Sequence, residues 1–109
     1  MQHSGEWHVL IFEARGYGHG IRRQLVEAVN AGPDLAAARA KAERQACRWK
    51  PEHPMLPRRR RVFRTSPDSW TVEVTGSTAG FHFEVQLAQL VADVAEVDGT
   101  GDKWLDESV

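Results

Sequence analysis

Four consecutive arginines and a fifth nearby form the strongest local charge feature of this 109-residue chain. Guanidinium groups form paired hydrogen bonds with phosphates and carboxylates, and a neighbouring aromatic ring such as Phe63 adds a stacking surface. The candidate binding residues are therefore Arg58, Arg59, Arg60, Arg61 and Arg64. Side chains along a strand alternate between its two faces. Only Arg59 and Arg61 can therefore share one face, and only Arg58, Arg60 and Arg64 can share the other.

The same run also has a structural interpretation. Positive charge on a strand discourages edge-to-edge pairing, and these arginines could instead meet Glu73, Glu84 and the acidic carboxyl-terminal residues within one fold. Residues 1–64 carry 13 Lys and Arg against 6 Asp and Glu, whereas residues 65–109 carry 1 against 9. This separation predicts a charged partner, a self-complementary fold or a head-to-tail dimer, and the sequence leaves all three open.

The other reactive side chains form no recognisable catalytic or metal-binding pattern. The glycines of residues 16–20 lack the further spaced glycine of a dinucleotide fingerprint and the Lys-Ser/Thr pair of a P-loop, so they indicate a turn. No two of the five histidines are three or four residues apart, the spacing that places two metal ligands on one helix face. Cys47 lies in an alanine-rich segment and is expected to be buried. We predict no enzyme, cofactor or metal site, although a pocket lined by His82, His19 and Cys47 would reopen that question.

Residues 1–98 are predicted to form a single domain, followed by an acidic tail over residues 99–109. Trp104 lies in this tail beside Leu105, and because an exposed Trp-Leu pair gains by being covered, Trp104 is a further candidate binding residue. The single Cys47 cannot form an internal disulfide, and no signal-peptide pattern or long apolar run is present. We therefore expect a cytoplasmic protein without a membrane partner.

Residues 1–49 contain two predicted strands and one predicted helix. An apolar run over residues 6–14 indicates a well-covered strand, and a glycine-rich turn follows it. Residues 21–29 fit either a strand or a helix, and we favour a strand because the turn suggests a hairpin. Asp34 can accept amide hydrogen bonds at the start of a helix, and apolar residues recur at helical spacing over residues 35–49.

Residues 50–57 contain three prolines, which exclude regular structure and predict a stiff crossover. Three strands are predicted beyond it, over residues 60–65, 70–75 and 81–87. The turn at residues 66–69 has proline where a type I turn favours it, which predicts a hairpin between the first two of these strands. Near Leu87 the apolar period changes from two to 3.6, which predicts a second helix that extends to residue 98.

These elements predict an α+β fold in the order ββα-βββα, with an antiparallel sheet covered by two helices. For function we expect a non-enzymatic protein-interaction or regulatory accessory module that uses charged faces and a sheet edge and associates with itself as a homodimer. The alternative is a nucleic-acid-binding domain that uses the arginine strip 58–64. Composition cannot separate the two, because both would use the same arginines.

Overall fold

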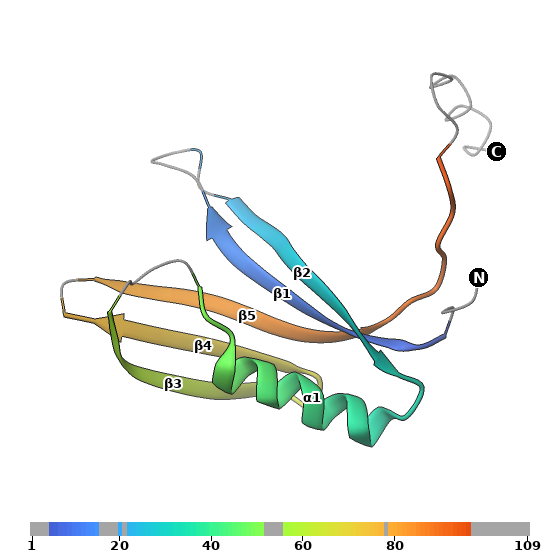
Figure 1. Cartoon of the computed structure of the whole chain (residues 1–109), viewed down its shortest axis with the longest axis horizontal. Coiled ribbons are helices and arrows are strands. Elements are labelled where there is room, and N and C mark those ends of the chain that lie inside the picture. The colour runs from blue at the N-terminus through green and yellow to red at the C-terminus, as the bar shows by residue number, and fades with distance from the viewer. Residues whose placement is uncertain (1–4, 16–19, 21, 52–55, 78, 97–109) are drawn as a thin grey trace.

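The computed structural model describes residues 5–15, 20, 22–51, 56–77 and 79–96. These residues form a five-stranded antiparallel sheet and one helix (Figure 1). The elements are β1 (Trp7–Arg15), β2 (Arg22–Gly32), α1 (Leu35–Arg48), β3 (Pro57–Ser66), β4 (Ser69–Gly76) and β5 (Gly80–Gln89). The spatial order is β2-β1-β5-β4-β3, so β2 and β3 are the two edge strands of the described sheet. The predicted α+β class is confirmed.

The first two strands pair antiparallel, which confirms the strand interpretation of residues 21–29 over the described residues 22–29. Their pairing runs from Trp7 opposite Gly32 to the amino-terminal end of β2, with register shifts between Trp7 and His8 and between Ile11 and Phe12. β2 ends at Gly32, whose φ of 83° is a conformation that L side chains rarely adopt. The predicted glycine turn falls mostly on residues 16–19, which lie outside the described residues.

Helix α1 begins where the sequence predicted it. The Asp34 side chain accepts a hydrogen bond of 2.8 Å from the Ala37 amide, which satisfies one of the free donors at the helix start. The small residues Ala38, Ala42 and Ala46 recur every fourth position and are fully buried. Because alanine has only a methyl group, the helix can approach the sheet closely.

The core lies between α1 and one face of the sheet. The predicted alternation in β4 is confirmed, because Trp70, Val72 and Val74 are buried. The predicted hairpin is also confirmed, since β3 and β4 pair across a short turn at Pro67 and Asp68. The remaining buried apolar residues of the sheet are Val9, Ile11, Phe83, Val85 and Leu87. We call the opposite side of the sheet, which no described helix covers, the open face.

The predicted second helix over residues 87–98 is wrong where the structure describes it. Strand β5 continues to Gln89 in register with β1, and residues 90–96 have no regular secondary structure. Val91 and Val94, two of the apolar residues whose helical spacing suggested this helix, are 83% and 74% exposed. A short helix is marginally stable in water unless packing buries its apolar face. No described element covers these valines, so a helix over residues 90–96 would gain no stability from burial, and strand pairing takes only the residues up to Gln89.

The predicted boundary between domain and tail, and the tail itself, lie outside the described residues, which end at residue 96. The assignment of residues 99–109 to an acidic tail therefore stays a prediction. Helix α1 has 14 residues and carries several charges, so no helix in the described part of the chain has the length and apolar character needed to span a membrane.

Candidate functional site

The arginines of β3 are divided between the two sides of the sheet, as alternation predicted. Arg60 lies opposite Val74, a core residue, whereas Arg61 lies opposite Glu73 on the open face. Arg61 donates a hydrogen bond of 2.7 Å to the Glu73 carboxylate, and its guanidinium lies 5.3 Å from the centre of the Phe63 ring. The predicted binding strip is therefore not one continuous surface.

Arg60 holds the carboxyl-terminal end of α1 against the sheet. Its guanidinium donates hydrogen bonds of 2.8 Å to the Ala46 oxygen and 2.6 Å to the Trp49 oxygen. Carbonyls at a helix end are otherwise unsatisfied and carry partial negative charge, so a cation is favourable there. Burial lowers the pKa of Arg60 below its ordinary value, and the nearby Cys47 acts in the opposite direction. Arg60 is thus committed to the fold.

Trp49, which caps α1, also connects the helix to the middle of the sheet. Its indole nitrogen donates a hydrogen bond of 2.8 Å to the carboxylate of Glu13 on β1. Glu13 is only 2% exposed, and a buried carboxylate requires hydrogen-bond donors to offset its loss of water. The end of α1 is therefore fixed to both β1 and β3.

Part of the charge separation seen in the sequence is neutralised within the chain. Each of three ion pairs joins a basic residue of the amino-terminal part to an acidic residue of the carboxyl-terminal part. These pairs are Arg23–Glu84 at 2.9 Å, Arg39–Asp68 at 2.7 Å and Arg61–Glu73 at 2.7 Å. The fold is thus partly self-complementary, which was one of the three interpretations of the sequence.

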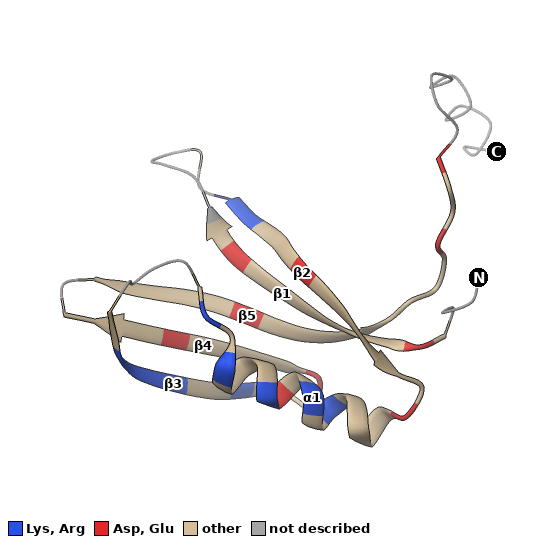
Figure 2. Ribbon diagram, in the orientation of Figure 1, with Lys and Arg blue, Asp and Glu red and all other residues tan. Residues whose placement is uncertain are grey.

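Part of the basic charge that remains lies beside α1. A groove with a volume of about 510 Å³ lies between α1 and the strands β3 and β4. Figure 2 shows basic segments on both α1 and β3. We call this site the helix–β3 groove, and it is lined by Arg39, Ala40, Glu43, Arg44, Cys47, Arg48, Arg64 and Trp70. Arg39 is paired with Asp68, so Arg44, Arg48 and Arg64 against Glu43 leave the groove with an excess of positive charge.

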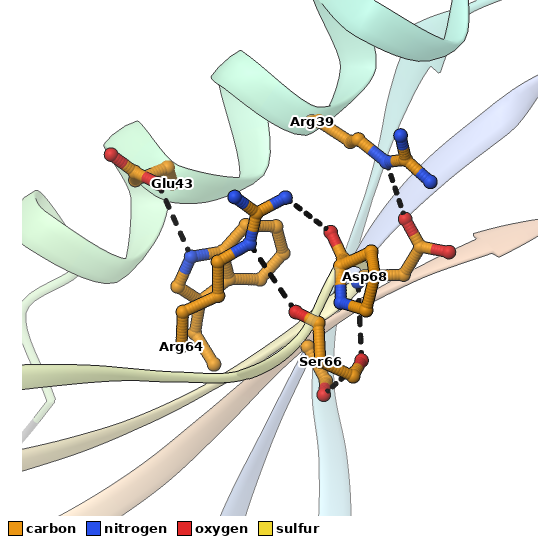
Figure 3. Close-up of polar contacts among 8 residues, drawn as sticks. Arg39, Glu43, Arg64, Ser66 and Asp68 are labelled. Atoms are coloured by element: carbon orange, nitrogen blue, oxygen red, sulfur yellow. Dashed lines mark hydrogen bonds and ion pairs between the residues drawn. The ribbon is translucent and has the colours of Figure 1, made fainter.

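Two of these arginines are held by the turn between β3 and β4 (Figure 3). Arg39 pairs with Asp68 in the turn at 2.7 Å. Arg64 donates hydrogen bonds to the backbone oxygens of Ser66 at 3.3 Å and Pro67 at 2.8 Å. Both guanidiniums are thereby oriented without being buried, as a site for an anion would require.

The floor of the groove is the indole of Trp70, which is 1% exposed. The Arg64 guanidinium lies 5.5 Å from the centre of this ring. The indole nitrogen is 3.4 Å from a carboxylate oxygen of Glu43 on α1. Trp70 therefore supports the groove but presents no ring face on which a nucleotide base could stack.

Arg44 and Arg48 differ from the other arginines of the groove. They lie four residues apart on α1, both are exposed, and neither forms an ion pair or side-chain hydrogen bond with another residue that the structure describes. Like charges at this spacing repel each other weakly. A carboxylate or phosphate placed between them would relieve that repulsion and form charge-assisted hydrogen bonds.

The remaining predicted site residues do not join this groove. Arg58 and Arg59 are exposed on β3, and Trp104 lies outside the described residues. The prediction that Cys47 is buried is wrong, because it follows Ala46 by one position, which turns it away from the sheet toward the groove. His82 lines a separate pocket of about 160 Å³. The described residues thus do not bring His82 and Cys47 together.

Within the described segments, no three His, Cys, Asp or Glu side chains are grouped so that they could hold a metal ion. The main residues that the sequence interpretation missed are Arg39, Arg44 and Arg48 on α1. The helical repeat could have revealed these arginines, because it places all three outside the face of the helix that carries the buried alanines. No protein-family model, curated protein or solved structure matches the chain.

Proposed function

We propose that this chain is a non-enzymatic binding module that takes an acidic surface of a protein partner into the helix–β3 groove. The observation that carries the proposal is the pair Arg44 and Arg48, which are exposed at the groove without a carboxylate partner among the described residues. Oriented guanidiniums from α1 and β3 suit carboxylate groups, which accept paired hydrogen bonds from arginine.

An acidic protein is favoured over nucleic acid by the charge of the chain and by the groove itself. Domains that bind nucleic acid through phosphates are typically strongly basic, whereas this chain has a net charge of −1 and a pI near 6.5. Glu43 and Asp68 also lie at the groove, where they would repel a continuous phosphate backbone. An acidic protein surface with separate carboxylates can avoid them.

Self-association is one way to supply that acidic surface. Residues 90–109, which follow the acidic partners of the three ion pairs, carry 6 Asp and Glu against 1 Lys in the sequence, so a second copy is a partner of suitable charge for the groove. The proposal then predicts a dimer whose dissociation is promoted by salt, because added ions screen attraction between exposed charges. Sedimentation velocity from about 50 to about 500 mM NaCl measures this effect.

The binding proposal is tested with a synthetic octapeptide that alternates Glu and Thr, labelled with a fluorophore and titrated into the full chain at low salt. We expect Arg44→Gln with Arg48→Gln to weaken binding about tenfold, because each exposed attraction contributes roughly 0.2–1 kcal/mol. The matched control is Arg22→Gln, since Arg22 on β2 is also exposed and likewise forms no ion pair with another described residue.

Two outcomes would contradict the proposal. A loss of binding free energy per substituted arginine as large in the Arg22 variant as in the groove variant would show that general charge, rather than the groove, attracts the peptide. Tighter binding of a single-stranded oligonucleotide of equal charge, with a steep dependence on salt, would instead support the nucleic-acid alternative.

A further inference from the structure

The edge strand β3 has backbone hydrogen-bonding groups that its only described neighbour, β4, cannot satisfy. β3 is the last strand in the order β2-β1-β5-β4-β3 and has ten residues. In an antiparallel pair, alternate backbone groups of each strand point toward the partner and the others point away. A row of donors and acceptors therefore runs along the outer side of β3, where another strand can pair.

The arginines of β3 determine which kind of strand can use this edge. Arg60 and Arg64 project toward α1, and Arg61 projects toward the open face. A second copy of β3 in this position would place guanidiniums close to guanidiniums, and like charges opposite each other destabilise strand pairing. The edge is thus protected against self-pairing but open to a strand of opposite charge.

The helix–β3 groove lies on the α1 side of this edge strand. Side chains of an added strand would point alternately toward the two sides of the sheet. Acidic residues on one side would face Arg44, Arg48 and Arg64 of the groove. Residues on the other side would extend toward the open face, where Arg61 and the 47% exposed Phe63 lie.

We infer that the partner of the groove is an extended acidic segment that pairs with β3 as a sixth strand of the sheet. This inference rests on the proposed function and specifies how the partner binds. Main-chain hydrogen bonds to β3 would supply part of the affinity, and carboxylates facing Arg44 and Arg48 would supply selectivity for acidic sequences. Arg60 keeps its hydrogen bonds to the carbonyl oxygens at the end of α1, because strand addition uses only the outer backbone groups of β3.

The test uses the alternating Glu-Thr octapeptide in three forms. One is unmodified, and two are N-methylated at every second residue, each on one edge of the extended peptide. N-methylation removes backbone donors without changing charge. We expect methylation of one edge to weaken binding about tenfold or more, while methylation of the other edge has little effect. An alternating Lys-Thr peptide is the charge control and should not bind.

A second measurement locates the bound strand. The full chain is labelled with ¹⁵N, and amide hydrogen exchange is followed with and without the unmodified peptide. We expect alternate amides of β3 to exchange at least about tenfold more slowly in the complex, while amides of the other edge strand, β2, are unchanged.

The outcomes separate this inference from the proposed function. Equal affinity for both methylated peptides, with binding still weakened by the Arg44 and Arg48 substitutions, would overturn strand addition and leave the groove proposal standing. Protection of β2 rather than β3 would also overturn strand addition at this edge. If no acidic peptide binds at low salt, the proposed function and the inference both fail.

Discussion

Arg60 of β3 donates a 2.6 Å hydrogen bond to the backbone oxygen of Trp49, the residue that caps α1. The indole of the same tryptophan donates to Glu13 on β1, 2.8 Å away. One capping residue thus connects the helix end to an edge strand and to an interior strand of the sheet. These contacts fix the position of α1 over the sheet and therefore the shape of the helix–β3 groove.

Arg60→Met should be clearly destabilising, because it removes two charge-assisted hydrogen bonds at the end of α1. We expect the free energy of unfolding to fall by about 1.5–3 kcal/mol. The matched control is Arg61→Met on the same strand, where the lost ion pair with Glu73 is largely exposed and should cost less than about 1 kcal/mol. Urea unfolding of both variants measures the difference. Equal destabilisation would show that Arg60 has no special role.

Trp49→Phe should also be destabilising, because it preserves an aromatic ring but removes one hydrogen-bond donor to the buried Glu13 carboxylate. Loss of a partner from a buried polar group costs about 1–3 kcal/mol, and more when that group is charged. A double-mutant cycle with Glu13→Met, which removes the acceptor oxygens, isolates this contact. We expect a coupling energy of about 0.5–3 kcal/mol, and strict additivity of the two substitutions would argue against the hydrogen bond.

Spacing along the sequence predicted the local elements well because local sterics and capping determine them. Asp34 before an alanine-rich helical period predicted α1, and the alternation of Trp70, Val72 and Val74 predicted β4. The second helix failed because Leu87 to Gln89 pair with β1 as the end of β5, and the exposed valines that follow have no described element to pack against. That pairing joins distant parts of the chain, so spacing alone could not show it.

The candidate site was only partly predictable for the same reason. Alternation correctly separated Arg60 from Arg61, but the sequence did not reveal that Arg60 reaches the end of α1 or that Arg64 shares a groove with Arg44 and Arg48. Those relations depend on where α1 lies on the sheet. That position is fixed by the contacts of Trp49 with Glu13 and Arg60, which join residues far apart in the sequence.

The close approach of α1 to the sheet predicts that Ala42 cannot be enlarged. Ala42 is fully buried, so Ala42→Leu should overpack the core and lower the free energy of unfolding by about 1–3 kcal/mol. Ala36→Leu is the control, because Ala36 is an exposed residue of the same helix and should change stability by less than about 0.5 kcal/mol. Thermal unfolding checks both. Tolerance of leucine at position 42 would contradict the packing described for α1.

The absence of a helix over the described residues 90–96 predicts that Val94 contributes little to stability. Val94→Thr should be nearly neutral, because this side chain is 74% exposed. Val85→Thr places a hydroxyl in the core and should cost about 1–3 kcal/mol. Chemical unfolding compares the two variants. A comparable loss in Val94→Thr would indicate that this region packs against the domain after all.

Reversal of the groove's charge tests the account most directly. Arg44→Glu combined with Arg48→Glu is titrated with the alternating Glu-Thr and Lys-Thr octapeptides at low salt, after circular dichroism has shown that the variant is folded. We predict that the original chain prefers the acidic peptide and that the variant prefers the basic one, each by about tenfold or more. An unchanged preference for the acidic peptide in the variant would contradict the assignment of the helix–β3 groove as the binding site.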